Sequence, residues 1–373
     1  MAPIHYNIPQ PAYLYYAVQA QTLKVAAVVF FILSIILVII IYTNTYIEKR
    51  YFLLKKVTQK RMTDWLAEKI TAIDESTVTV EIPERINKIL KSNYAKKIIV
   101  DKLIALKNNL LGNEAANIIS LYQALGLKNS SIKKLYSKKW YVKAKGIHEL
   151  YTMDQRDLLK VIYKNANSKN ELVRTEAQTG IVHMYGFDGL RFLGVISNPI
   201  SAWQQIKLLA QLQNKQPDQV FFKKLNNWLE AKNDTVIIFC LKIAAIYKIE
   251  EVLPTIILKC LQHPNPTIRK TAIETMVAFP QKSETTILKA RYSLETKQNK
   301  IVLLTAIKKI GSRHDTQFLK NIVLAEDIDL AREAMVTLLT ITPEMKTWNE
   351  QILIQKSKVT KCTLHAIDAL AYQ

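Results

Sequence analysis

The sequence predicts an all-α protein that carries one membrane-spanning helix near its N-terminus. Glycine is scarce, with 8 residues in 373, and long stretches are rich in Leu, Ile, Lys, Ala and Glu. Alternation of apolar and polar residues, the main signal of a half-buried strand, is rare. The segment Val25–Tyr42 has no charged residue and one polar interruption, Ser34. At about 1.5 Å per residue, a helix of this length crosses the hydrocarbon core of a bilayer.

The charges around this span predict its orientation. Lys24 is the only lysine or arginine before it, and Glu48 is the only acid in the twenty residues after it. Six basic residues share that second segment: Lys49, Arg50, Lys55, Lys56, Lys60 and Arg61. By the positive-inside rule, residues 1–23 form a short tail outside, residues 24–42 cross the inner (plasma) membrane, and the remainder is cytoplasmic. A cleavable signal peptide is disfavoured because it needs a basic start, a shorter apolar core and a small-residue cleavage site.

Three further segments are expected before residue 138. Residues 43–75 place apolar residues three and four apart between basic ones, which predicts a basic juxtamembrane helix. This helix either runs straight on from the span or lies against the membrane. Residues 76–83 alternate briefly and end at a proline, so we expect a linker there. Residues 84–137 are expected to form an N-terminal helical cap, in which 84–127 contains three helices with a break near Gly112.

A repeated pattern begins at about residue 138. Its clearest unit, residues 252–276, has Pro254 early in an apolar helix, a polar turn at Asn265, and a second helix that opens with Ile268 and Arg269. Other units align on a β-branched residue or leucine: Val142, Val173, Ile200, Val236, Ile268, Ile301, Leu330 and Val359. A basic residue follows in some units, and a polar residue precedes the helix in others: Lys143, Arg174 and Arg269, and Asn170, Asn233, Asn265, Gln298 and Asp327.

This unit resembles the HEAT repeat, whose pattern has a proline in the first helix, Asp or Asn in the turn, and then Val-Arg. The resemblance implies that residues 138–373 form a right-handed α-solenoid of paired antiparallel helices, in which neighbouring pairs bury a continuous core. The arginine is missing after Val236, Ile301, Leu330 and Val359, and the unit at Ile200 is the least regular. An anchored protein of this kind is similar to bacterial HEAT-like proteins.

The formal net charge of +21 bears on partners and solubility more than on the fold. Its densest stretch, Lys128–Lys145, contains no acid, and we take seven of its residues as candidate contacts with a partner or an anionic surface: Lys133, Lys134, Lys138, Lys139, Trp140, Lys143 and Lys145. The stretch is a solvated face, a contact for lipid headgroups or an acidic protein, or a nucleic-acid surface. Nucleic acid is the least favoured, because the stretch lacks the arginines that read bases in bidentate fashion.

Motifs that carry chemistry are missing from the sequence. Neither a G-x-G-x-x-G nor a P-loop is present, the six histidines have no ligand spacing, and there is no C-x-x-C. We therefore expect no catalytic residue, no cofactor and no metal. Three widely spaced cysteines suit a reducing compartment and are expected to be small core residues: Cys240, Cys260 and Cys362.

The leading functional hypothesis is a non-enzymatic scaffold that gathers protein partners at the cytoplasmic face of the membrane. A membrane glycosyltransferase or a signalling protein is a possible partner by analogy alone, since a fold does not determine function. The alternative is an enzyme or nucleic-acid-binding protein that works in the groove of the solenoid, similar to HEAT-like DNA glycosylases or bilin lyases. Salt-dependent binding of DNA would favour that alternative. A third hypothesis is adhesion of the basic stretch to lipid.

Overall fold

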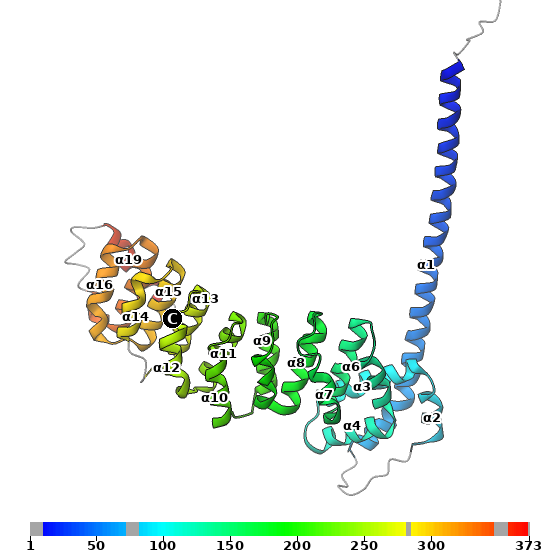
Figure 1. The fold of residues 1–373 in the computed structure, drawn as a ribbon, viewed down its shortest axis with the longest axis horizontal. Coiled ribbons are helices and arrows are strands. Elements are labelled where there is room, and N and C mark those ends of the chain that lie inside the picture. The colour runs from blue at the N-terminus through cyan, green and yellow to red at the C-terminus, as the bar shows by residue number, and fades with distance from the viewer. Residues whose placement is uncertain (1–9, 72–81, 281–284, 347–356, 372–373) are drawn as a thin grey trace, which may run out of the picture. The chain divides into compact units, whose positions relative to one another are not determined.

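The computed structural model describes residues 10–71, 82–280, 285–346 and 357–371, and all elements within these ranges are helices (Figure 1). The predicted all-α class is therefore confirmed. The chain divides into two compact units, Met1–Ser130 and Ser131–Gln373. The division falls inside helix α5 (Leu127–Leu135), shortly before the position where the repeats were expected to begin.

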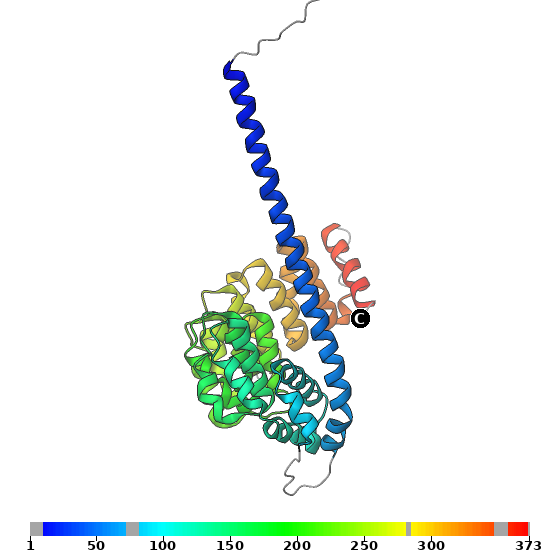
Figure 2. The same cartoon turned by 90° about the vertical axis from the view of Figure 1, so that its right-hand side faces the viewer.

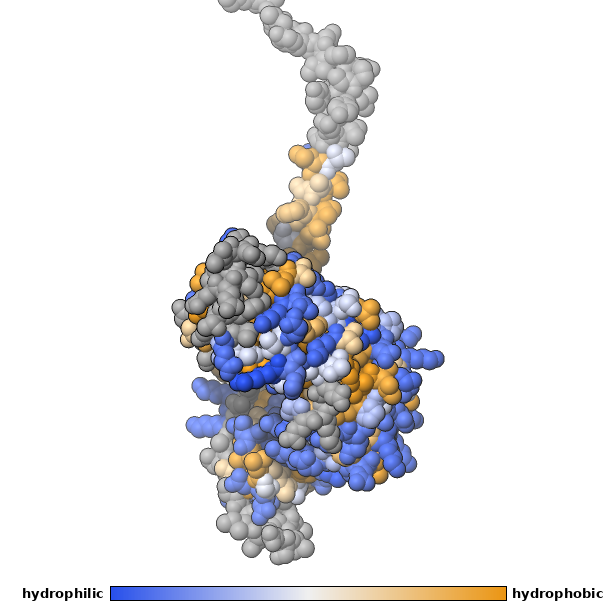
Figure 3. Space-filling view, turned by 90° about the vertical axis from the view of Figure 1, so that its left-hand side faces the viewer, coloured by the Kyte–Doolittle hydropathy of each residue, from blue (hydrophilic) through white to orange (hydrophobic). Residues whose placement is uncertain are grey.

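Helix α1 (Gln10–Thr71) runs without interruption for 62 residues (Figures 1 and 2). It begins well before the predicted start at residue 24, and the expected juxtamembrane helix is its direct continuation. The section Thr22–Leu53 contains an 18-residue window with a mean hydropathy of 3.2, which is long and apolar enough to cross a membrane, and none of that window is buried by the rest of the chain. Figure 3 shows this section as an orange column. The Ser34 hydroxyl donates to the Phe30 carbonyl at 2.8 Å, so the one polar side chain of the span is satisfied within the helix.

Three further helices of the first unit match the three predicted between residues 84 and 127: α2 (Glu84–Leu90), α3 (Asn93–Lys107) and α4 (Gly112–Ala124). The end of α1 packs on α3 and α4 through the buried side chains of Trp65, Leu66 and Ile70. Asn117 Nδ2 also donates to the Ile70 carbonyl at 2.9 Å. Residues 76–81 of the predicted linker 76–83 lie outside the described residues.

In the second unit, regular helices alternate along most of the chain with shorter ones, and we call them second and first helices. The second helices are α6 (Trp140–Thr152), α8 (Glu171–Tyr185), α9 (Ala202–Leu212), α11 (Asp234–Tyr247), α13 (Pro266–Met276), α15 (Lys297–Ile310), α17 (Ile328–Ile341) and α19 (Ser357–Ala371). The first helices are shorter and often contain 3-10 or π turns: η1 and α7 (Arg156–Leu158, Leu159–Tyr163), η2 (Gly186–Gly194), α10 (Gln219–Trp228), η3, α12 and η4 (Glu250–Val252, Leu253–Thr255, Ile256–Cys260), α14 and η5 (Thr285–Arg291, Tyr292–Leu294), and η6 and α16 (Arg313–Asp315, Thr316–Ala325). A short η7 (Pro343–Lys346) follows α17.

Capping residues set where the second helices begin. Four of the predicted turn residues accept a backbone N–H at the start of the next helix: Asn170, Asn233, Asn265 and Asp327. This bond satisfies one of the donors that a helix start leaves unpaired. The apolar residue three positions later is buried in each case: Val173, Val236, Ile268 and Leu330.

Two predicted positions were wrong. Gln298 lies inside α15, because Thr296 caps that helix and Asn299 occupies the buried third position. Ile200 precedes α9, because Ser201 caps it and Gln204 is buried at the third position. Serine and threonine cap a helix about as well as asparagine, so an alignment on apolar residues misplaced both helix starts.

Second helices pack on their successors for much of the unit. α6 contacts α8, α8 contacts α9, and contacts continue from α11 through α13, α15 and α17 to α19. One cluster of buried residues runs from Leu135 to Ala366. All three cysteines are buried in the described core, as predicted, and burial raises the pKa of the Cys260 thiol to about 12.

Candidate functional site

The basic residues predicted to set topology follow the apolar stretch Val25–Tyr42 along α1. Lys49, Arg50, Lys56 and Lys60 are exposed. The side chains of Lys55 and Arg61, also predicted to set topology, lie outside the described residues. The Arg50 guanidinium lies 5.7 Å from the centroid of the Tyr46 ring, which is within range of a cation–π contact.

The acid-free stretch forms an exposed surface around the turn between α5 and α6. Trp140 and Tyr141 are 50% and 52% exposed and their rings meet edge to face, with centroids 5.6 Å apart. Tyr136 is exposed as well. We call these aromatic residues and the exposed lysines around them the basic–aromatic patch: Lys133, Tyr136, Lys138, Lys139, Trp140 and Tyr141. Its composition suits an acidic protein surface or anionic headgroups.

Lys134 does not belong to this patch. Its Nζ lies 2.6 and 2.8 Å from the two carboxylate oxygens of Glu149, whose side chain is 0% exposed. The Ser131 hydroxyl donates to the same carboxylate at 2.6 Å, and Lys145 Nζ lies 4.0 Å from it. Lys134 and Lys145 are thus drawn towards a buried acid, while Lys143 is half-buried.

A polar cluster joins α6, α8 and α9, and the sequence analysis missed it. We call it the His148–Glu176 cluster, comprising His148, Tyr151, Glu176, His183, Lys207 and Gln211. Tyr151 OH donates to Glu176 Oε2 at 3.0 Å, and Lys207 Nζ donates to Glu176 Oε1 at 2.8 Å. His148 Nδ1 lies 3.2 Å from Glu176, and His183 Nδ1 lies 2.8 Å from Gln211 Oε1. The sequence separations, 28 and 31 residues, are about one repeat and were the available signal.

Burial and neighbouring charges set the protonation of two residues of this cluster, Glu176 and Tyr151. Burial alone would raise the pKa of Glu176, but hydrogen bonds from His148 and Lys207 outweigh it and lower the pKa to about 2. Burial, followed by the charge of Glu176, raises the pKa of Tyr151. Glu176 is therefore ionised and Tyr151 protonated at neutral pH. The hydrogen bonds of Glu176 link α6, α8 and α9 to one another.

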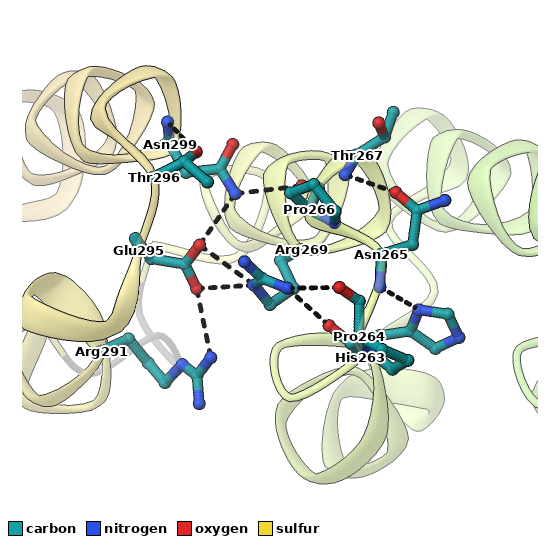
Figure 4. A network of polar contacts seen from close by, with 10 residues as sticks. All are labelled: His263, Pro264, Asn265, Pro266, Thr267, Arg269, Arg291, Glu295, Thr296 and Asn299. Atoms are coloured by element: carbon teal, nitrogen blue, oxygen red, sulfur yellow. Dashed lines mark hydrogen bonds and ion pairs between the residues drawn. The ribbon is translucent and has the colours of Figure 1, made fainter.

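The repeat arginine Arg269 lies at the centre of a second network (Figure 4). Its Nη1 donates to the carbonyls of His263 and Pro264 at 2.8 and 2.9 Å, which closes the turn before α13. Its Nε donates to Glu295 of the next pair at 2.9 Å, and Glu295 also accepts from Arg291 and Asn299. Burial would raise the pKa of Glu295, but these hydrogen bonds outweigh it and hold the pKa below its usual value.

Across the residues that the structure describes, no group of three or more His, Cys, Asp or Glu side chains is placed to hold a metal ion.

A shallow depression of about 700 Å³ lies beside the His148–Glu176 cluster, lined by Arg156, His183 and Lys215 among others. Lys215 Nζ donates to the His183 carbonyl at 3.1 Å, so its positive charge lies at the C-terminal end of α8, where the helix dipole favours a cation.

In comparisons with known proteins, no protein-family model and no curated protein sequence matches this chain.

Proposed function

We propose that this chain is a membrane-anchored α-solenoid of HEAT-like repeats that acts as a non-catalytic scaffold, binding protein partners at the cytoplasmic face of the inner membrane. The observation that carries the proposal is a second helix, α9, that leaves large apolar side chains exposed. On α9, Trp203 is 69% exposed and Ile206, one turn later, is 58% exposed. Tryptophan is the residue most enriched at the centres of protein interfaces.

The solenoid is supported by bonds between successive pairs. Asn265 Nδ2 donates to Asp234 at 2.6 Å, and Asn299 Nδ2 donates to the Pro266 carbonyl at 3.0 Å. Lys300 Nζ continues the series to Glu326 at 2.7 Å. The partners are 26 to 33 residues apart, which is the separation that nearest-neighbour contacts between repeats of this length require.

Anchoring is supported by the unburied apolar section of α1 and by the cations that follow it. With this topology, protease added outside sealed spheroplasts should leave residues beyond about 54 intact. The same protease should digest them once the membrane is opened. An epitope at the C-terminus followed by immunoblotting measures both, and loss of the epitope in sealed spheroplasts would reverse the proposed orientation.

The scaffold role is tested by cross-linking the full-length protein in intact membranes. The Trp203→Ala variant should reduce the yield of the cross-linked partner at least tenfold, because a tryptophan at the centre of an interface contributes about 2 kcal/mol or more. Leu258→Ala is the matched control, since Leu258 is 63% exposed but lies on the first helix η4. Equal yields from the two variants would place the contact elsewhere, and a partner-free protein would contradict the scaffold role.

A further inference from the structure

A cavity of about 370 Å³ lies within the first unit, between α1 and the start of α3. Its described walls carry aromatic rings, hydroxyl groups and a guanidinium, and no acid is among the lining residues that the structure describes: Tyr46, Ile47, Arg50, Tyr51, Ser92 and Tyr94. The cavity is therefore formed by the segment of α1 that follows the apolar stretch Val25–Tyr42 and by the start of α3. Neither the basic–aromatic patch nor the His148–Glu176 cluster shares a residue with it.

Cations and rings are interleaved around this cavity. The Tyr51 and Tyr94 rings pack against each other with centroids 6.0 Å apart, which joins α1 to α3. Lys97 Nζ lies 5.5 Å from the centroid of Tyr51, and Arg50 lies over Tyr46. Arg50, which lines the cavity, and Lys97, which lies beside it over the ring of a lining tyrosine, are thus each held by an aromatic face. A guanidinium presents paired donors that match the oxygens of a phosphate.

The place of the cavity along α1 indicates its ligand. Tyr46 and Tyr51 follow Tyr42, the last residue of the apolar stretch, by four and nine residues. At about 1.5 Å per residue they lie roughly 6 and 14 Å beyond the hydrocarbon core, and the headgroup layer extends about 5 to 8 Å beyond it, so Tyr46 lies within that layer and Tyr51 just outside it. This estimate rests on the proposed function, because it takes α1 to cross the membrane. Tyrosine is also enriched at this depth in membrane proteins.

We infer that the cavity binds the headgroup phosphate of an anionic phospholipid of the cytoplasmic leaflet. Arg50 and Lys97 supply the positive charge, and the hydroxyls of Ser92 and Tyr94 supply neutral donors. Ile47 and the Tyr46 ring, which lie nearest the hydrocarbon core, contact the glycerol of the lipid. The bound lipid ties α3 to the leaflet, so the first unit holds the membrane through a headgroup as well as through its span.

The test uses the full-length protein in phosphatidylglycerol vesicles that contain a phosphatidylglycerol analogue with a photoactivatable headgroup. Peptide mapping after illumination should place label on α1 and on the α3 peptide that contains Tyr94. The Arg50→Gln variant should lose about tenfold of the α3 label, because it removes the charge-assisted pair with the phosphate. Lys49→Gln is the matched control: it removes one neighbouring charge that does not line the cavity, and the α3 label should be unchanged. Arg50→Lys keeps the charge without the paired donors and should give an intermediate yield.

The outcomes separate this site from the anchor on which it rests. Label on α1 but not on α3, or equal α3 label in Arg50→Gln and Lys49→Gln, would overturn the site and leave the span intact. Absence of label from both helices would overturn the anchor and the site together. Loss of the α3 label in a large excess of inorganic phosphate would show that the cavity takes free phosphate instead of lipid, which also overturns the inference. Circular dichroism of each variant checks that the helices remain folded.

Discussion

The Lys134→Met variant should lose about 3 kcal/mol of local stability in α5 and α6, because removing one partner of a buried ion pair leaves an uncompensated charge. Glu149 would keep the Ser131 hydroxyl and the more distant Lys145, so the loss should fall at the lower end of the usual range. Hydrogen exchange of the α6 amides is the suitable measurement, since proteins open locally as well as globally. The amides should exchange about 100-fold faster than in the parent protein.

Lys133→Met is the control for this prediction. It removes the same charge one residue earlier, from an exposed side chain, and should change the exchange of α6 by less than about twofold. The double variant Lys134→Met with Glu149→Leu should recover part of the loss, because an apolar pair removes the buried charge altogether. Equal exchange in the two single variants would contradict the ion pair.

The Arg269→Met variant should lose about 2 to 3 kcal/mol of local stability around α13 and α15. It removes hydrogen bonds to two carbonyls and to Glu295, whose side chain is 1% exposed. The loss should be smaller than complete isolation of Glu295 would cause, because Arg291 and Asn299 remain as donors. Hydrogen exchange of the α13 and α15 amides measures it.

Lys270→Met supplies the matched control, as Lys270 is 46% exposed and lies 3.9 Å from Glu274, a pair that contributes little. The effect of Arg269→Met should also depend on pH. The pKa of Glu295 is lowered by folding, so its stabilisation is present above about pH 4.3, the usual glutamate value, and is lost as the pH falls through the folded-state pKa. A variant effect that persists unchanged below that pKa would show that the carbonyl bonds alone matter.

Features that depend on a few consecutive residues could be predicted. A capping bond joins residues two or three apart, so Asn170, Asn265 and Asp327 marked helix starts correctly. The same reasoning failed at Ser201 and Thr296, because the buried position that follows is polar there. Gln204 and Asn299 are tolerated in the core because Gln178 and the Pro266 carbonyl accept their amide hydrogens, and both acceptors come from the preceding pair.

The apolar stretch Val25–Tyr42, the helix content and four of the helix starts were determined by the sequence alone, since each depends on local hydrogen bonds and on the apolar character of contiguous residues. Which of two adjacent lysines faces a buried acid was decided by the tertiary structure. Lys133 and Lys134 point about 100° apart around α5, and only the packing of α6 brings Glu149 to one of them. The His148–Glu176 cluster and the cavity at Arg50 likewise join side chains from different helices, and no spacing within one helix encodes such contacts.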